Sequence, residues 1–355
     1  MVNLDDISTY SKHDPANMIS QLHSLPQQCL DAWNKATQFK LPNDYSDIDK
    51  LIISGMGGSA IGGDLIQSLA SVAGKPIVFV NRNYSLPNFV DSKTLVVFSS
   101  YSGNTEETLS SFDEALGTNC KKLVLTTGGK LKNNADKAQV PVFFIDHISQ
   151  PRAALGYSFI SLTAFLGNLG FLKDISVDIQ ALTRFLESTL STELNEAVPT
   201  DSNPAKQLAA NLYGKVPVIY SAEVLSGVAR RWKTQINENS KTWSFNEVFP
   251  ELNHNSIAGY RFPLKLASEV CVVLLRCPSL HSRVLTRYSI TSEILEQNHI
   301  RYQVVDSRGE DILSQMMSLV FFGDWTSYYL AILNGTDPTP ISPIDYFKKR
   351  LDKAG

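Results

Sequence analysis

The sequence predicts an α/β fold made of two doubly wound parallel sheets, each flanked by helices. Short apolar runs alternate with helical patterns along most of the 355 residues, as expected for parallel strands that are joined by helices. The second half of the chain repeats the strand–helix order of the first half. Loops rich in glycine, serine and threonine follow two strands of the first half, at the strand ends where doubly wound sheets bind ligands.

Composition narrows the class of protein. Hydrophobic residues make up 43% of the chain, charged residues 19%, and the net charge is −3, so we expect neither nucleic acid nor a membrane surface as a partner. The longest apolar stretch, 316–333, contains Asp324 and is interpreted as a buried helix. Four cysteines without a Cys-x-x-Cys pair, and no signal-peptide pattern, indicate the cytoplasm. The six histidines lack zinc-ligand spacing, so we expect no metal.

Residues 1–45 are expected to form an N-terminal helical extension. Residues 1–14 are polar and expected to be irregular. Asp14 and Pro15 are typical of a helix N-cap followed by a proline at the first helical position. Apolar residues then recur at helical spacing, in a helix that Pro26 is expected to kink or split. We interpret this extension as a docking segment.

Residues 46–198 are expected to form the first domain. Short aliphatic runs, each followed by a polar loop, are typical of strands buried on both faces of a parallel sheet. The longer stretches between these runs have helical patterns. The expected strands are 51–54, 77–80, 94–98, 122–126 and 142–145, and the expected helices are 59–73, 104–116, 153–171 and 177–196.

A glycine-rich turn follows the first of these strands. Gly55, Gly57 and Gly58 come directly after the apolar run, and Ser59 opens the next helix. This arrangement aims free backbone N–H groups and the positive end of the helix dipole at an anion. It also fits the loose dinucleotide fingerprint. No acidic residue follows the second strand, although Arg82 at that position would suit a 2′-phosphate.

A second polar loop, Ser99-Ser100-Tyr101-Ser102-Gly103-Asn104-Thr105, follows the strand 94–98 and continues into a helix. Its hydroxyl and amide donors lie at the carboxyl end of a strand, where ligands bind near the switch point of the sheet. Together the two loops predict one small phosphate held from both sides. The alternative is that these residues are ordinary loop and capping residues.

Arg152 follows the last strand of the first domain. An arginine at a strand exit, beside serine loops, is a candidate for contacting substrate oxygens, because its guanidinium offers a fork of N–H donors. The alternative is a solvated residue at the start of the helix 153–171. The local sequence favours neither.

Residues 199–355 are expected to form the second domain. It has the same strand–helix order but lacks the glycine turn, because Ser221-Ala-Glu follows its first strand. We therefore expect the two domains to share a fold and to divide the labour. The expected strands are 216–220, 269–275 and 302–305, and the expected helices are 205–213, 225–238, 283–298 and 312–333.

The second domain carries two candidate proton-transfer residues. Glu238 lies between two asparagines at the end of the helix 225–238, and His254 lies between two more in a stretch expected to be irregular. A carboxylate and an imidazole brought to one cleft form an acid/base pair. The alternatives are a solvated helix-end residue for Glu238 and a hydrogen-bonded loop residue for His254.

Four motifs in this sequence resemble the bifunctional phosphoglucose/phosphomannose isomerase family, which is built from two sugar isomerase domains. The first two are shared by many sugar-phosphate-binding domains, and the last two are much more specific. The resemblance extends from the first helix to the last residues. The motifs are Gly-Met-Gly-Gly-Ser at 55–59, Ser-Tyr-Ser-Gly-Asn-Thr at 100–105, Asn-Glu-Asn-Ser-Lys at 237–241 and Glu-Leu-Asn-His-Asn at 251–255.

The resemblance implies an enzyme that interconverts glucose 6-phosphate, and mannose 6-phosphate as a further substrate, with fructose 6-phosphate. The proton would move between C1 and C2 through a cis-enediol(ate), without a metal or a cofactor. Glu238 would move this proton, His254 would help to open the sugar ring, and Arg152 would stabilise the enediolate oxygen. The residues implied to hold the phosphate are Gly58, Ser59, Ser100, Ser102 and Thr105.

The resemblance also implies a homodimer in which His254 reaches the active site of the other subunit. The family uses a lysine near the carboxyl end, and we assign this role to Lys348, with Lys349 as an alternative. A hydroxyl group in the same region is linked to acting on both C2 epimers. Thr339 and Ser342 are the two candidates for it.

Two other classes of protein are compatible with the loops. A non-catalytic sugar-phosphate sensor on the same fold would usually carry an output module, and the segment 1–45 is too small to be one. An NADP-dependent oxidoreductase is the third possibility.

Overall fold

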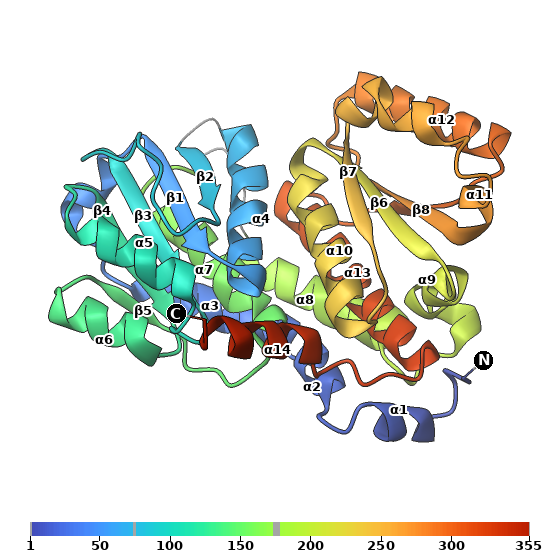
Figure 1. The fold of residues 1–355 in the computed structure, drawn as a ribbon, viewed down its shortest axis with the longest axis horizontal. Coiled ribbons are helices and arrows are strands. Elements are labelled where there is room, and N and C mark those ends of the chain that lie inside the picture. Colours follow the sequence, from blue (N-terminus) through green and yellow to red (C-terminus); the bar gives the residue numbers. More distant parts are fainter. Residues whose placement is uncertain (1, 74–75, 173–177, 355) are drawn as a thin grey trace.

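The computed structural model describes residues 2–73, 76–172 and 178–354 and contains two parallel sheets set side by side (Figure 1). The first sheet has the strand order β2-β1-β3-β4-β5, and the second has the order β7-β6-β8-β9. Every strand pair in both sheets is parallel. In each sheet the first strand lies between the second and the third, so the predicted pair of doubly wound sheets is confirmed.

The observed strands begin and end within two residues of the expected ranges, except that β7 was not expected. Those of the first sheet are β1 Lys50–Gly55, β2 Ile77–Asn81, β3 Thr94–Ser99, β4 Lys121–Thr126 and β5 Val142–Phe144. Those of the second sheet are β6 Val216–Ala222, β7 Phe245–Phe249, β8 Val270–Arg276 and β9 Arg301–Asp306.

The helices cover the sheets and join them. In the first half they are α1 Ser8–His13, α2 Met18–His23, α3 Leu25–Gln38, α4 Gly57–Ala73, α5 Glu106–Leu116, α6 Gly129–Lys137, α7 Ser161–Asn168 and α8 Ile179–Thr189. In the second half they are α9 Pro204–Leu212, α10 Ser226–Asn239, α11 Leu266–Glu269, α12 Ser282–Gln297, α13 Ile312–Leu333 and α14 Ser342–Leu351.

Strand residues of the first sheet alternate between two hydrophobic layers. Leu51 and Ile53 of β1 belong to the large cluster that also contains side chains of α3, α4 and α7. Ile52, between them, packs in a smaller cluster with Phe112 of α5 and Leu131 of α6. Helices therefore cover both faces of this sheet, which explains why its strands appear as continuous apolar runs in the sequence.

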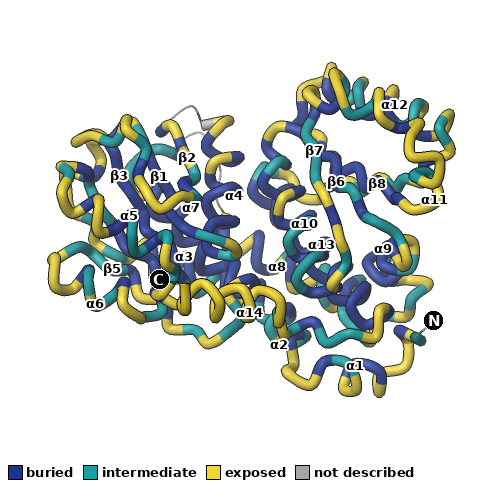
Figure 2. Tube along the Cα trace, viewed as in Figure 1, coloured by how far each residue is buried: buried dark blue, intermediate teal, exposed yellow. Residues whose placement is uncertain are grey.

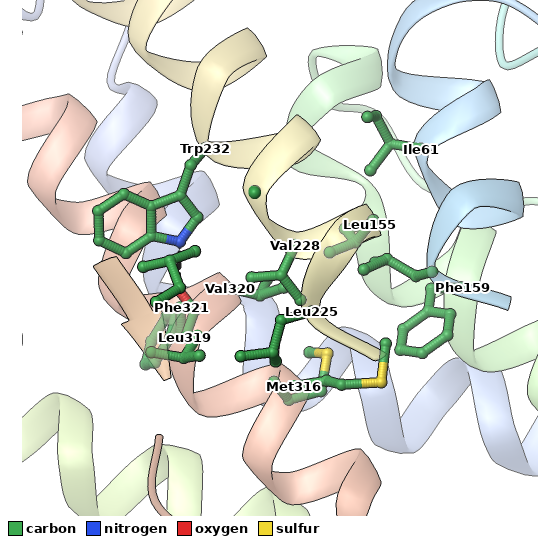
Figure 3. Packing of buried hydrophobic residues seen from close by; sticks show 14 of the residues in the cluster. Ile61, Leu155, Phe159, Leu225, Val228, Trp232, Met316, Leu319, Val320 and Phe321 are labelled. Atoms are coloured by element: carbon green, nitrogen blue, oxygen red, sulfur yellow. Dashed lines mark hydrogen bonds between the residues drawn. The ribbon is translucent and has the colours of Figure 1, made fainter. Parts of the chain in front are cut away.

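Helices α4, α10 and α13 join the two sheets. Gly227 lets α10 approach α4 closely, because a Cβ atom at this position would lie 2.7 Å from the carbonyl oxygen of Asp64. The N–H of Gly227 also donates to the hydroxyl of Ser68 on α4 at 3.1 Å. Figure 3 shows side chains of the first half, such as Ile61 and Phe159, in one cluster with those of α10 and α13. The two sheets thus share a continuous core.

Helix α13 has the bounds expected from the sequence and lies in this core (Figure 2). It is the one helix of the described residues that is long and apolar enough to cross a membrane, but 89% of its most apolar window is buried inside the protein. Asp324, in the middle of the helix, forms an ion pair with Arg231 of α10 at 2.6 Å. The prediction of a buried helix is confirmed.

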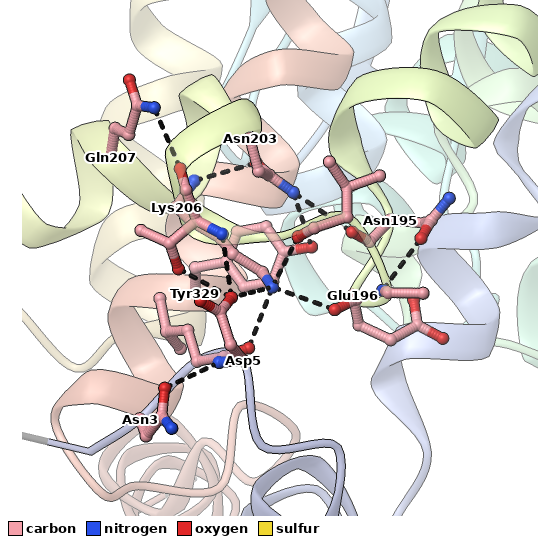
Figure 4. Close-up of polar contacts among 12 residues, drawn as sticks. Asn3, Asp5, Asn195, Glu196, Asn203, Lys206, Gln207 and Tyr329 are labelled. Carbon is pink, nitrogen blue, oxygen red and sulfur yellow. Dashed lines mark hydrogen bonds and ion pairs between the residues drawn. The ribbon is translucent and has the colours of Figure 1, made fainter.

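The N-terminal extension docks on the second half of the chain through Lys206 of α9 (Figure 4). The ammonium group of this fully buried lysine donates to the carbonyl oxygens of Leu4, Glu196 and Val198 at 2.8–2.9 Å, and to the carboxylate of Asp5 at 3.0 Å. Burial lowers the pKa of Lys206, and the neighbouring carboxylates oppose that effect.

The structure tests three expectations for the extension, of which one is confirmed. Residues 1–14 are not irregular throughout, because Tyr10 is buried against α13 and α1 forms around it. Asp14 is not the N-cap and Pro15 is not the first helical residue, because α2 begins at Met18 and Asn17 is its N-cap. The Asp14 carboxylate still accepts hydrogen bonds from the backbone N–H groups of Met18 and Ile19. The expected split near Pro26 is confirmed, and it falls between α2 and α3.

The expected helix 153–171 is confirmed in part, because an unbroken run of helical residues extends from 155 to 168, but it is not a regular α-helix throughout. The chain forms a 3₁₀ turn at Pro151–Ala153, a π-helical turn at Gly156–Ile160, and only then α7. The side chain of Gln28 from α3 donates to the carbonyl of Ala153 at 2.9 Å, and Gly156 packs directly against α3. This contact with another helix interrupts regular backbone hydrogen bonding. The start of the expected helix 177–196 lies outside the described residues.

Strand β7 and helices α6, α11 and α14 escaped the sequence analysis. Strand β7 lies at the edge of the second sheet, where Phe245 is exposed and Asn246 and Glu247 are half-buried, so it lacks an apolar run. Helix α6 is predominantly polar, with only Leu131 and Ala135 buried. Strand β7 pairs with β6, and α6 packs against α5, β4 and β5.

Candidate active site

The glycine turn and the serine loop lie side by side, because β1 and β3 are neighbours in the first sheet. The Ser59 hydroxyl accepts a hydrogen bond from the N–H of Tyr101 at 3.1 Å, and the Ser99 hydroxyl donates to the carbonyl of Ser59 at 3.2 Å. Helix α4 begins at Gly57, so its N-terminus opens onto the same place. The two loops are therefore locked together at the switch point, where an anion would meet N–H groups.

The serine loop is held in one shape by close backbone contacts. Gly103 has φ +65°, and a Cβ atom there would lie 1.8 Å from the carbonyl oxygen of Gly128, so only glycine fits. The hydroxyl groups of Ser100 and Thr105 are 2.9 Å apart, and Thr105 is the N-cap of α5. Ser102 is exposed, and its hydroxyl accepts from the backbone of Asn104, so the polar rim of the loop faces solvent.

Gly58 connects the glycine turn to Arg152. A Cβ atom at Gly58 would lie 3.0 Å from both the backbone nitrogen and the Cα of Arg152. A side chain at this position would push the two segments apart. The glycine is thus needed for the approach of Arg152 to the phosphate loops as well as for the turn itself.

Arg152 is buried, with 3% of its surface exposed, and it is fixed along one edge of its guanidinium group. Its Nε donates to the Asn239 side-chain oxygen at 2.7 Å, and its Nη2 donates to the carbonyls of Pro338 and Thr339, each at 2.8 Å. Nη1 points to the Glu238 carboxylate, 3.7 Å away. Burial lowers the pKa of Arg152, but an arginine remains charged at neutral pH. Arg152 is therefore not a solvated residue at the start of a helix, which was the alternative interpretation.

Glu238 lies near the end of α10, with 21% of its side chain exposed. Lys241 follows the helix, and its ammonium group donates to the carbonyl of Glu238 and to that of Pro338. Burial first, and the charge of Arg152 second, lower the pKa of Lys241 to about 8. The Glu238 carboxylate thus faces Arg152, and the Lys241 ammonium is bound to the backbone of the same residue, so positive charge would face an oxygen bound beside the carboxylate.

His254 is exposed and ends a short 3₁₀ turn, Glu251–His254, beyond β7. In a parallel sheet the carboxyl ends of β6 and β7 lie at the same edge, and α10 starts at that edge and runs back along the sheet. Glu238 is near the far end of this helix, which is about 20 Å long. Within the described residues, no hydrogen bond or ion pair connects His254 with Glu238 or Arg152, so one chain does not bring them together.

The C-terminal candidates differ in their surroundings. Thr339 accepts from Arg152 through its carbonyl, and its buried hydroxyl has no partner among the described residues. Ser342, Lys348 and Lys349 lie on α14, none of whose residues, all of them described, is buried. Figure 1 shows α14 reaching from the second half back toward the first. In the described parts of the chain, neither lysine contacts Arg152 or Glu238 by a hydrogen bond or an ion pair.

Sequence reasoning missed Asn239, Lys241 and the carbonyls of Pro338 and Thr339 as parts of this site. Asn239 and Lys241 belong to the motif at 237–241, so their signal was present but unassigned. Backbone carbonyls leave no signal in a sequence. Arg82, the candidate for a 2′-phosphate, is instead paired with Asp64. The residues that the structure describes contain no group of three or more His, Cys, Asp or Glu side chains that could hold a metal ion.

Two parallel α/β sheets, with serine and glycine loops at the switch point of one and a carboxylate beside a buried arginine, define a protein of the sugar isomerase domain class. Solved structures share this fold. A hypothetical protein of Thermus thermophilus superposes with a TM-score of 0.70, covering 98% of this chain and 93% of that one at 17% identity. The tagatose-6-phosphate ketose/aldose isomerase of Escherichia coli superposes with a TM-score of 0.63, covering 90% and 93% at 16% identity.

Sequence relatives are more specific. A family model described as the bacterial phospho-glucose isomerase C-terminal SIS domain matches residues 201–351. The bifunctional phosphoglucose/phosphomannose isomerase of Caldicellulosiruptor bescii is 41% identical over 335 residues, which cover 94% of this chain and 98% of the relative. That of Aquifex aeolicus is 35% identical, over 88% and 93%. The chain belongs to the bifunctional phosphoglucose/phosphomannose isomerase family.

Proposed function

We propose that this enzyme interconverts glucose 6-phosphate with fructose 6-phosphate, accepts mannose 6-phosphate as well, and works without a metal or a cofactor. The contact between Arg152 and Glu238 is the observation that carries the proposal. It places a cation and a carboxylate 3.7 Å apart, next to the paired loops at the first switch point. Proton transfer next to a carbonyl group requires this combination of a base and a positive charge.

The proposed reaction assigns one role to each group of the site. The N-terminus of α4, Ser59 and the serine loop hold the phosphate. Glu238 removes the proton from C2 of the open-chain aldose, which gives a cis-enediolate, and returns it to C1 to form the ketose. Nη1 of Arg152, the part of the guanidinium not used for anchoring, faces the oxygen on which negative charge develops. His254 assists ring opening.

For the C-terminal roles, we propose that Thr339 rather than Ser342 governs acceptance of both C2 epimers. Its unpartnered buried hydroxyl beside Arg152 supports this choice, whereas Ser342 is exposed at the start of α14. The role of Lys348 remains a prediction from the resemblance, with Lys349 as the alternative.

We further propose a homodimer in which His254 serves the active site of the other subunit. The position of His254 at the opposite end of α10 from Glu238 supports this sharing. Two large apolar side chains that follow His254 in the sequence are exposed in the single chain: Phe262 by 63% and Leu264 by 81%. Exposed large apolar side chains are typical of a surface that another protein covers.

Sharing of His254 predicts complementation between two inactive variants. We expect Glu238→Gln and His254→Ala to be inactive when expressed alone. When they are co-expressed, a mixed dimer has one site with both residues intact. Random pairing would restore about a quarter of the wild-type kcat per chain. The measurement is the turnover of fructose 6-phosphate by purified mixtures carrying two different affinity tags. Mixed dimers without any recovered activity would contradict the sharing.

The isomerase activity itself is tested by hydrogen exchange. We expect incubation with fructose 6-phosphate in heavy water, with EDTA present, to give glucose 6-phosphate that carries deuterium at C2, detected by NMR. Labelled mannose 6-phosphate in the same sample would establish the second epimer, and Thr339→Val should lower its share. Binding of fructose 6-phosphate without exchange would instead indicate a sugar-phosphate sensor.

We also propose a cytoplasmic location and three parts of the chain, namely an extension at 1–45 and two sugar isomerase domains at 46–198 and 199–355. The four cysteines form no disulfide, which supports a reducing compartment. The family model that begins at residue 201, and the separate sheets on either side of the second boundary, support the division.

A further inference from the structure

A chain of buried hydrogen bonds connects Arg152 to the core helix α13. The Nε–H of Arg152 donates to the side-chain oxygen of Asn239 at 2.7 Å. The side-chain amide of Asn239 donates to the hydroxyl of Ser327 at 3.0 Å. The Ser327 hydroxyl in turn donates to the carbonyl of Asp324, one turn earlier in α13, at 2.7 Å. Asn239 and Ser327 are both fully buried.

Every hydrogen bond in this chain has a fixed direction. Because the only proton of the Ser327 hydroxyl goes to the Asp324 carbonyl, the oxygen can only accept from Asn239. Asn239 must then turn its N–H₂ group to Ser327 and its oxygen to Arg152. The Nε–H of Arg152 can only donate, so the orientation of the Asn239 amide is fixed from both sides, by Arg152 and by Ser327.

A second connection reaches the backbone of Arg152 from the same turn of α13. The Asp324 carboxylate binds Arg231 with both oxygens, at 2.6 and 3.0 Å. Arg231 donates to the carbonyl of Arg152 at 3.1 Å, and Gln235 donates to Asp324 at 3.1 Å. Arg231, Gln235 and Asn239 are spaced four residues apart, so they form one polar stripe on the face of α10 that packs against α13.

Such a stripe is poorly explained by stability alone. Apolar side chains of similar volume in place of a buried ion pair are often neutral or stabilising. The polar groups instead end on the two parts of Arg152 that determine where its free Nη1 points.

We propose that Ser327, acting through Asn239, is a positioning residue that holds Arg152 in the orientation needed to face the enediolate oxygen. This inference rests on the proposed isomerase function. Loss of the Ser327 hydroxyl leaves the N–H₂ group of Asn239 without its acceptor. The Asn239 oxygen that anchors Arg152 Nε is then held from one side only, while the phosphate loops are untouched. The defect should appear in the transition state and not in substrate binding.

The experiment compares Ser327→Ala with Ser240→Ala. Ser240 is equally buried, and its hydroxyl also joins α10 to α13 by donating to the Ser327 carbonyl at 2.6 Å, but it lies outside the chain of hydrogen bonds to Arg152. We expect Ser327→Ala to lower kcat by about 10- to 100-fold with KM nearly unchanged, as misplacement of a catalytic group does. Ser240→Ala should lose a similar amount of thermal stability and keep its kcat.

Two inhibitors separate positioning from general damage. An arabinonohydroxamate 5-phosphate copies the planar, anionic enediolate. A hexitol 6-phosphate carries the phosphate and hydroxyl groups but has no planar anionic group. We expect Ser327→Ala to weaken binding of the hydroxamate by about 10-fold or more and to leave binding of the hexitol phosphate unchanged. The reason is that only the hydroxamate places a negative charge opposite Arg152. Asn239→Ala, which removes the acceptor of Arg152 Nε itself, should show the same separation and serves if Ser327→Ala does not fold.

Equal loss of both inhibitors, or equal kcat values for Ser327→Ala and Ser240→Ala, would overturn the proposal. A wild-type protein that binds sugar phosphates but does not isomerise them would instead refute the proposed function. The two failures are therefore distinguishable.

Discussion

Glu238→Gln is expected to lower kcat by about 10²- to 10⁴-fold, the usual contribution of a positioned general base. The amide has almost the same shape as the carboxylate but cannot take a proton from C2. The hydrogen bonds that join the two phosphate loops do not involve Glu238, so the dissociation constant of a hexitol 6-phosphate should stay within a few-fold of the wild-type value. Steady-state kinetics with fructose 6-phosphate and calorimetric titration measure the two quantities.

Glu187→Gln is the matched control for this variant. Glu187 is an exposed glutamate on α8 and takes no part in the contacts around Arg152. It loses the same charge, so its kcat should remain at the wild-type value. Near-normal turnover by Glu238→Gln would rule out Glu238 as the base.

Arg152→Lys should be nearly as damaging, although it conserves the charge. The lysine ammonium cannot reproduce the planar fork that reaches Asn239, Pro338 and Thr339 along one edge and Glu238 with the remaining nitrogen. We expect kcat to fall by about 10²- to 10³-fold, as found when an oxyanion-stabilising donor is removed. Carbonyls left without donors should also lower the free energy of unfolding by about 1–3 kcal/mol.

Arg230→Lys provides the comparison for that substitution. Arg230 lies on the same helix as Glu238, but 48% of its side chain is exposed, and it contacts Asp64 only at 3.8 Å. Its replacement should alter neither kcat nor the midpoint of thermal unfolding. If Arg152→Lys retained kcat within a few-fold of wild type, Arg152 would not be the group that stabilises the enediolate oxygen.

Local patterns in the sequence were sufficient for most of the fold. Strands buried on both faces must be continuous apolar runs, so β1, β3 and β8 were found within one or two residues of their observed bounds. Helix α13 was found with its observed bounds from its long apolar stretch, and in the structure Asp311 caps its start. Edge strand β7 and polar helix α6 were missed, since their own residues bury too little to leave a pattern.

The phosphate loops were also predictable, because each needs only a strand, a glycine and hydroxyl donors that are close together in the sequence. Their contact across the switch point follows from the order of the strands in a doubly wound sheet. The motif at 237–241 and that at 251–255 indicated the family, but not where their side chains would lie.

The sequence by itself determined the α/β class, the two sheets, the anion-binding loops and the family. The tertiary structure alone decided between the two interpretations of Arg152, because its partners Asn239 and Pro338 are 87 and 186 residues away along the chain. It also separated His254 from Glu238 by the length of α10. Local periodicity depends on which residues neighbour each other along one element. The surroundings of a buried side chain depend on how distant helices pack, and no local pattern contains that information.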